Sequence, residues 1–318
     1  MAAGPVRVGI VLRQQEMEEH GRELGALMDR IAAAGLDHVT VGDHVSFAGG
    51  QGSDGLIQAT ALLSSHPSLA VETGVYLITL RHPATVARQL ATLCSIAPGR
   101  LSFGVGIGGD DRRELELCGV DPKTRGARAD ESLELLRALM GGNEVTHEGR
   151  FFRVSDAAIR PAPTPAPRIL VGGRADAAIR RAARFGNGWI AVWVSARRFA
   201  EATAQFAELA EEAGRPARGE HVLQLWAGFG KGPEEARAAV APVMERSYGI
   251  SAARFERYVP YGRPEEVAAT LAPYLEAGAR QFNFVPEGGE LERRIEAVGA
   301  VKAQLEIEHG GDSEHARA

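Results

Sequence analysis

Cysteine is scarce in this chain: two of its 318 residues, Cys94 and Cys118, carry a thiol. Two cysteines cannot build a disulfide framework or a cysteine-based metal cluster. No Cys/His cluster with metal-ligand spacing is present either, and a G-x-S-x-G motif, which carries the nucleophile of many serine hydrolases, is absent. The sequence therefore predicts free thiols, no bound metal and no serine-hydrolase chemistry.

Long apolar runs and basic runs are also lacking. No segment approaches the roughly 20 apolar residues that span a bilayer, and the opening MAAGPVRVGIVL shows no signal-peptide cleavage pattern. The formal net charge is −5, which disfavours the phosphate backbone of a nucleic acid as a partner. We expect a cytoplasmic protein that acts on a small-molecule substrate, with no membrane or nucleic-acid partner.

The chain does have length and apolar residues. Its composition is 45% hydrophobic, and one α/β barrel of about 250 residues plus insertions would use that length. We expect a single domain over residues 1–308. The last stretch, 309–318, has no apolar period and is predicted to be a disordered tail.

The clearest structural unit runs from Glu72 to Asp110. An apolar run ends at Thr79, and Pro83 can begin a helix because the first helical residue needs no N–H partner. Apolar residues then recur at helical spacing until Pro98-Gly99. A second β-rich run, 101–107, follows and ends among glycines. This pattern predicts two parallel strands joined by a crossover helix.

The same strand–helix rhythm covers the rest of the chain. Strands are expected at 6–12, 38–41, 69–79, 101–107, 168–171, 189–194, 221–229 and 281–285, and helices at 22–34, 57–64, 130–140, 175–185, 197–213, 233–244, 264–277 and 291–305. Between about 143 and 167 the rhythm breaks, because EVTHEGRFFRV alternates like a hairpin and RPAPTPAP is a proline-rich connector. An interdomain linker is the alternative, but the rhythm resumes at once. The fold prediction is a (β/α)8 TIM barrel with an insertion between strands 4 and 5.

Active sites of such barrels lie at the C-terminal ends of the strands. Asp43 and His44 follow the second strand, where His44 could hydrogen-bond a ligand or move a proton. A histidine satisfied within its loop is the alternative. Arg81 and His82 follow the third strand and could reach a ligand or form a structural salt bridge.

Gly172-Gly173-Arg174 joins the fifth strand to a helix, where free N–H groups and the positive helix end can hold a phosphate. A tight turn with a surface arginine is the alternative. The glycine-rich run at 104–109 follows the fourth strand, whereas a Rossmann fingerprint should stand near the start of its domain, so we reject a Rossmann domain. Four charged residues of the fourth helix, Arg125, Arg128, Asp130 and Glu131, are expected to tie that helix to the elements around it.

Four segments, TGVYLITLRHPATVARQLATL, GRLSFGVGIGGD, RGARADESLELLRAL and ILVGGRADAAIRRAARFGNGW, occur in order on the predicted strands. Together they resemble the luciferase-like monooxygenase superfamily, particularly its coenzyme F420-dependent oxidoreductase branch, from Val6 to about Leu305. The resemblance implies a TIM barrel with an insertion that binds reduced FMN or F420 at its C-terminal mouth as a homodimer.

The resemblance also assigns residues. His44 matches the catalytic histidine beside the deazaflavin ring, and Gly74-Val75 matches a non-proline cis peptide behind it. The implied cofactor-binding residues are Asp43, His44, Gly74, Val75, Gly106, Gly108, Gly172, Gly173 and Arg174. One position departs from the pattern: F420-dependent glucose-6-phosphate dehydrogenases carry a catalytic glutamate where this chain has Gly109, which puts that specific activity in doubt.

The function these observations favour is hydride transfer between F420 and a small organic substrate. One alternative is an FMN-dependent monooxygenase that uses oxygen, and another is a barrel that binds ligands without a cofactor. Substrate specificity would lie in three variable stretches, Phe47 to Gly55, Val145 to Pro167 and Tyr248 to Tyr261.

Overall fold

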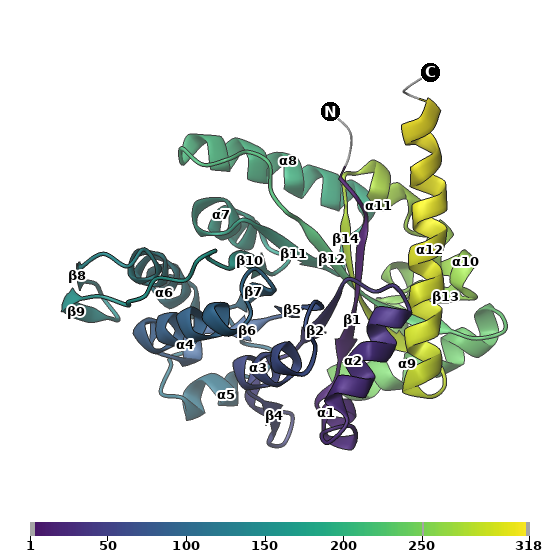
Figure 1. Ribbon diagram of the computed structural model, residues 1–318, viewed down its shortest axis with the longest axis horizontal. Coiled ribbons are helices and arrows are strands. Elements are labelled where there is room, and N and C mark those ends of the chain that lie inside the picture. Colours follow the sequence, from purple (N-terminus) through teal and green to yellow (C-terminus); the bar gives the residue numbers. More distant parts are fainter. Residues whose placement is uncertain (1–3, 250, 316–318) are drawn as a thin grey trace.

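The computed structural model describes residues 4–249 and 251–315 and shows a closed barrel of parallel strands surrounded by helices (Figure 1). Pairing of the fourth strand with the fifth completes the ring. In order, the barrel strands are β1 (Arg7–Leu12), β2 (His38–Val41), β5 (Ala70–Thr73), β7 (Leu101–Gly106), β10 (Arg168–Gly172), β11 (Gly188–Val192), β12 (Val222–Phe229) and β14 (Gln281–Glu287). The (β/α)8 prediction is confirmed.

Helices cover the outside of this ring (Figure 1). They are α2 (Leu24–Ala33), α3 (Gly55–Ser65), α4 (Pro83–Ile96), α6 (Arg125–Met140), α7 (Asp176–Phe185), α8 (Ala196–Glu212), α9 (Pro233–Tyr248), α10 (Pro264–Ala269), α11 (Ala272–Glu276) and α12 (Leu291–His315). Pro83 is the first residue of α4, and His82 caps that helix by accepting the Ala84 N–H. Apolar stripes on these helices pack against the barrel and form the main core.

Two expected elements are divided in the structure. The strand expected at 69–79 consists of β5, a cis peptide between Gly74 and Val75, β6 (Tyr76–Leu77) and the 3-10 helix η1 (Ile78–Leu80). The helix expected at 264–277 breaks into α10 and α11, with Pro273 near the start of α11. Proline has no N–H to donate to the preceding turn, which accounts for the second break.

The sequence did not predict the short elements at the strand ends. They are α1 (Gln14–Glu19), β3 (His44–Phe47), β4 (Gln51–Ser53), α5 (Arg112–Leu117), β13 (Tyr261–Gly262) and the 3-10 helices η2 (Ala252–Arg254) and η3 (Glu256–Tyr258). These pieces are shorter than the window over which a hydrophobic period can be recognised. Several of them position the site residues described below.

A hairpin forms where the alternating pattern predicts one. Strands β8 (Val145–Glu148) and β9 (Arg153–Ala157) pair antiparallel between β7 and β10 in the sequence. The carboxylate of Glu131 on α6 accepts backbone N–H groups of Arg150, Phe151 and Phe152 and so ties the turn of the hairpin to the barrel. The description of this segment as an insertion stays a prediction.

A layer of polar side chains fills the barrel interior near the N-terminal ends of the strands. The Asn283 amide donates to Glu72 at 2.6 Å, and its oxygen accepts from His38 Nε2 at 2.7 Å. Gln281 donates to the second Glu72 oxygen. A Cβ on Gly9 would clash with the His38 ring, so only glycine fits at this position. The buried end is therefore packed, which leaves the C-terminal mouth for a ligand.

The C-terminal helix α12 continues to His315, so it extends into the segment 309–318 that the sequence predicts to be disordered. Residues 316–318 of that segment lie outside the described residues. Within the described part of the chain, no helix has both the length and the apolar character of a membrane span.

Candidate active site

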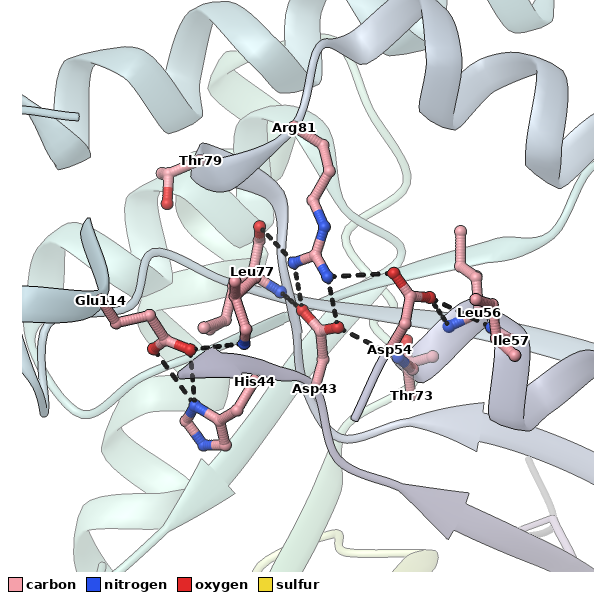
Figure 2. Close-up of polar contacts among 12 residues, drawn as sticks. Asp43, His44, Asp54, Leu56, Ile57, Thr73, Leu77, Thr79, Arg81 and Glu114 are labelled. Carbon is pink, nitrogen blue, oxygen red and sulfur yellow. Dashed lines mark hydrogen bonds and ion pairs between the residues drawn. The ribbon is translucent and has the colours of Figure 1, made fainter. Parts of the chain in front are cut away.

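His44 lies at the C-terminal mouth, where β3 begins directly after β2. Its Nδ1 is 3.2 and 3.3 Å from the two carboxylate oxygens of Glu114 on α5, which follows β7 (Figure 2). One oxygen of Glu114 also accepts the N–H groups of Val45 at 2.7 Å and Ser46 at 3.1 Å. Glu114 is 2% exposed, so this pair is a fixed part of the structure.

The Glu114 contact assigns the proton on the His44 ring. A carboxylate only accepts hydrogen bonds, so Nδ1 carries a hydrogen, and in the neutral imidazole Nε2 is the nitrogen left with a free lone pair. The His44 side chain is 36% exposed, and its ring stacks on Phe47 with centroids 4.4 Å apart. The arrangement of an oriented imidazole with an available Nε2 suits a general base or acid.

Sequence reasoning missed Glu114. Within the stretch GGDDRRELEL nothing distinguishes Glu114 from Glu116 two residues later, yet Glu114 is buried against β3 and Glu116 is exposed. The difference depends on which side of a short helix faces another loop, and six residues of helix carry too little periodicity to reveal it.

Asp43, the neighbour of His44, is predicted from the sequence to contact the cofactor, but its carboxylate is fully buried and bound to protein. It accepts the N–H groups of Leu77 and Gly55 and pairs with both terminal nitrogens of Arg81, at 2.6 and 2.8 Å (Figure 2). Burial raises the pKa of the Asp43 carboxyl, and the charge of Arg81 opposes that rise. Asp43 therefore holds the loop before His44 in place.

The sequence leaves two roles open for Arg81, contact with a ligand or a structural salt bridge, and the structure shows the salt bridge. Besides Asp43, it pairs with Asp54 at 3.1 Å, and its guanidinium lies 4.5 Å from the centre of the Tyr76 ring. Asp54 in turn caps α3 by accepting the N–H groups of Leu56 and Ile57. With all of these contacts made inside the protein, Arg81 joins the loops after β2 and β5 into one unit.

The peptide between Gly74 and Val75 is cis, as the resemblance implies. The Val75 side chain packs into space left by two glycines on neighbouring strands. A Cβ on Gly172 would lie 2.8 Å from a Val75 methyl carbon, and a Cβ on Gly106 would be still closer to the other. Gly106 and Gly172 are thus required by the bulge at Val75, whichever ligand binds above it.

The turn after β10 has the geometry of an anion site. Gly173 has φ of +136°, and its carbonyl accepts the Trp189 indole N–H at 2.6 Å, which fixes the turn. Helix α7 follows with Ala175 at its N-cap, where no side chain satisfies the first N–H groups. Arg174 is exposed beside them. Free N–H groups, the positive end of a helix and an arginine together suit a phosphate.

Arg125, on the first turn of α6, lies over Gly109, the residue that stands where the resemblance expects a glutamate. A Cβ on Gly109 would lie 2.8 Å from Arg125 Nε, so this guanidinium fills the space above that glycine. Its Nη1 donates to the Pro122 carbonyl at 2.7 Å, and its Nε is buried without a partner. No carboxylate in the described part of the chain forms an ion pair with Arg125. Its neighbours tie α6 to the elements around it as expected: Arg128 donates to the Thr79 carbonyl, Asp130 pairs with Arg181, and Glu131 binds the turn of the β8–β9 hairpin.

No group of three or more His, Cys, Asp or Glu side chains in the described ranges is arranged to hold a metal ion. Cys94 and Cys118 are both free thiols, as predicted. The chemistry available at the mouth is therefore that of His44 with Glu114, beside a turn suited to an anion.

The profile of the family described as luciferase-like monooxygenase matches residues 6–299 of this chain. An uncharacterised protein of Mycobacterium tuberculosis is 38% identical over 147 residues, which are 46% of this chain and 50% of that protein, so the chain spans about half the length of this relative. An F420-dependent glucose-6-phosphate dehydrogenase of Nakamurella multipartita is 28% identical over 329 residues, covering 94% of this chain and 96% of the enzyme.

Solved structures share the fold. An F420-dependent secondary alcohol dehydrogenase, in complex with an F420–acetone adduct, superposes with a TM-score of 0.83 at 20% identity over 95% of this chain and 99% of that one. The EDTA monooxygenase of Chelativorans sp. BNC1 gives 0.77 at 16% identity over 96% and 94%. At these identities the likeness concerns the barrel alone.

Proposed function

This chain belongs to the luciferase-like monooxygenase family, and from that premise we propose that it is an oxidoreductase that transfers hydride between coenzyme F420 and a small organic substrate. The observation that carries the proposal is the oriented His44–Glu114 pair at the mouth of the barrel. The proposal is supported by relatives that match most of the chain length and are named as F420-dependent dehydrogenases.

The residues at the mouth fit the coenzyme. The uncapped start of α7 with Gly173 and Arg174 would hold its phosphate, and the unpaired guanidinium of Arg125 would add a second cation. Val75, supported by the two glycines beside it, would back the ring. A side chain at Gly173 would itself disturb the fold, because its Cβ would meet Ala178 at 2.8 Å.

When bound, the coenzyme would supply the hydride donor or acceptor. The protein would supply the proton step. His44 Nε2 would take the hydroxyl proton of an alcohol as it is oxidised, or return that proton when a carbonyl is reduced. Glu114 would hold the imidazole in the tautomer that can do so, and the buried Asp43–Arg81 pair would keep the loop in position.

A second candidate is an FMN-dependent monooxygenase that uses oxygen. It is favoured by the fold shared with the EDTA monooxygenase, and the same phosphate turn would hold FMN. The two candidates differ in the cofactor that they bind, F420 or FMN. The first experiment is therefore a measurement of cofactor binding.

We expect purified protein titrated with F420 and with FMN to bind F420 the more tightly, by absorbance and fluorescence. Arg174→Ala should weaken that binding about tenfold or more, because a charge-assisted contact to phosphate is lost. Arg180→Ala, on the exposed side of α7, is the matched control and should bind like the wild type. Tighter binding of FMN would favour the monooxygenase, and binding of neither would leave the cofactor-free barrel.

We also propose a homodimer with residues 1–308 as one domain and the β8–β9 hairpin as an insertion on it. Among the apolar residues of α3, Leu62 and Leu63 lie in the chain's own core, whereas Ile57 is 70% exposed. Val45 and Leu117, on β3 and α5, are exposed as well. Exposed apolar side chains of this size on neighbouring elements favour an interaction surface.

Light scattering at micromolar concentration is expected to give the mass of two chains. Ile57→Glu should shift that mass toward one chain, since burying an unpaired carboxylate in an interface is costly. Ile96→Glu, an equivalent change at an exposed site on α4, is the control. A wild-type mass of one chain would refute the dimer.

A further inference from the structure

Tyr248, the last residue of α9, has no part in the proton step, yet it lies in a cluster of aromatic side chains at the mouth. Three rings surround its own, with centroids 5.6 Å away for Trp193, 5.5 Å for Phe255 and 6.1 Å for Trp226. Helix α9 lies toward the same end of the barrel as β4 and α5 (Figure 1). Because Tyr248 is 41% exposed, a ligand at the mouth can reach it.

Trp226 shows on which face of β12 this cluster lies. The side-chain oxygen of Gln224 would be 2.7 Å from a Cβ on Gly74, so Gln224 points into the barrel. Side chains alternate along a strand, and Trp226, two residues later, therefore points inward as well. It packs with Val285, its register partner on β14, in a cluster separate from the main core. The aromatic cluster thus belongs to the inner side of the mouth.

The backbone of Trp193 places its ring in the same cluster. Trp193 follows β11 with φ of +55°, a conformation that is unfavourable for a bulky residue, and its ring packs 4.4 Å from Phe255. Strand β11 pairs in parallel with β10 as far as Gly172. Residues after β11 therefore lie beside the glycine turn that follows β10. Tyr248, which packs on Trp193, is one strand away from that turn.

The contact between Trp226 and Tyr248 assigns the hydrogen of the tyrosine hydroxyl. Trp226 Nε1 is 3.1 Å from the Tyr248 hydroxyl oxygen, and an indole N–H can only donate. The Tyr248 oxygen accepts this bond, which leaves its own O–H to donate to another group. Among the described residues, no acceptor lies within hydrogen-bond distance of that O–H. Burial raises the pKa of the Tyr248 hydroxyl, so it stays a donor at neutral pH.

Two strand ends bring a charge close to this hydroxyl. The charge of Asp110, after β7, raises the pKa of Tyr248, and the charge of Arg174, in the turn after β10, lowers it. Both charged side chains are exposed. Asp110 is the competing acceptor, but it makes no hydrogen bond with Tyr248 in the structure. A free O–H and a guanidinium on the same side of the mouth are two donors suited to one anion.

From this geometry we propose that Tyr248 is a further cofactor-binding residue, whose hydroxyl donates a hydrogen bond to the cofactor's phosphate at the turn of Gly173 and Arg174. Trp226 is then a positioning residue, because its N–H occupies the hydroxyl oxygen and directs the O–H hydrogen away from the cluster. The inference rests on the proposed function for its ligand. It applies to F420 and to FMN alike, since both carry a phosphate.

Ligands that differ in the phosphate test this contact. F420 is compared with its phosphate-free deazaflavin chromophore, and FMN with riboflavin, each titrated into the full chain by fluorescence. Tyr248→Phe keeps the ring and removes the hydroxyl. We expect it to weaken F420 binding about tenfold or more, as the loss of a hydrogen bond to a charged group does, and to leave binding of the phosphate-free chromophore unchanged.

Tyr258→Phe is the matched control. The Tyr258 side chain lies near Tyr274 of α11, among the helices outside the barrel, so this variant should bind F420 like the wild type. Melting curves of both variants should stay close to that of the wild type, because each keeps its ring.

Wild-type affinity of Tyr248→Phe for F420 would overturn the inference, and a loss of binding in Arg174→Ala would still leave the proposed function standing. Equal weakening of the phosphate-free chromophore would overturn it as well, because the contact would then be to the ring. If FMN binds and F420 does not, the hydride-transfer proposal fails, but Tyr248→Phe should still weaken binding of FMN and not of riboflavin. Binding of neither cofactor would overturn both.

Discussion

Replacing His44 with alanine is expected to lower the rate of hydride transfer by about a hundredfold or more while the fold stays intact. In the proposed mechanism, the free Nε2 of His44 moves the substrate proton. Glu114 keeps its two backbone N–H donors from Val45 and Ser46 in the variant. The buried carboxylate is therefore not left unpaired, and little stability should be lost.

Stopped-flow kinetics of the bound cofactor, measured beside a melting curve, tests this expectation. Cofactor affinity should change less than the rate, since the turn at Gly173 and Arg174 is untouched. His82→Asn is the control, because His82 is an exposed histidine at the next strand end and asparagine preserves its capping of α4. A lower melting temperature of His44→Ala with unchanged kinetics would show that His44 is a satisfied loop residue.

Glu114→Gln is expected to reduce the rate by a similar factor, about a hundredfold or more, for a different reason. Both backbone N–H groups donate to one Glu114 oxygen, and the other oxygen faces His44 Nδ1 at 3.2 Å. The amide oxygen of glutamine would retain the backbone bonds, which places its NH₂ group against Nδ1. Nδ1 must then accept, so the ring hydrogen moves to Nε2, which can no longer take a proton.

This prediction distinguishes orientation of the histidine from simple structural support. Glu114→Gln should melt close to the wild type, whereas Glu114→Ala should lose both rate and stability because Val45 and Ser46 lose their acceptor. Glu116→Gln, two residues along the same short helix and exposed, should change neither. If Glu114→Gln transferred hydride at the wild-type rate, the tautomer would not matter and Glu114 would serve the fold alone.

Local sequence patterns were sufficient for the barrel. The strands are short stretches rich in apolar and β-branched residues: the stretch at 38–41 is β2, and the stretch at 101–107 contains β7. Each helix shows a 3.6-residue period and ends near glycine or proline, as α4 does. These signals are contained within a few neighbouring residues, so they can be recognised without knowing what the segment packs against. The glycine turn after β10 and the histidine after β2 are placed at the mouth by the same order of elements.

The interaction partners of the charged residues were decided only by the tertiary structure. Asp43 meets Arg81 across 38 positions, and His44 meets Glu114 across 70. Arg125 occupies the space above Gly109, and Val75 occupies the space beside Gly106. Both contacts arise because the ends of separate strands converge at one mouth. A charged side chain has the same local pattern whether it faces solvent, an ion-pair partner or a ligand. Burial and the distance to the opposite charge decide among these, and both arise only when the barrel closes.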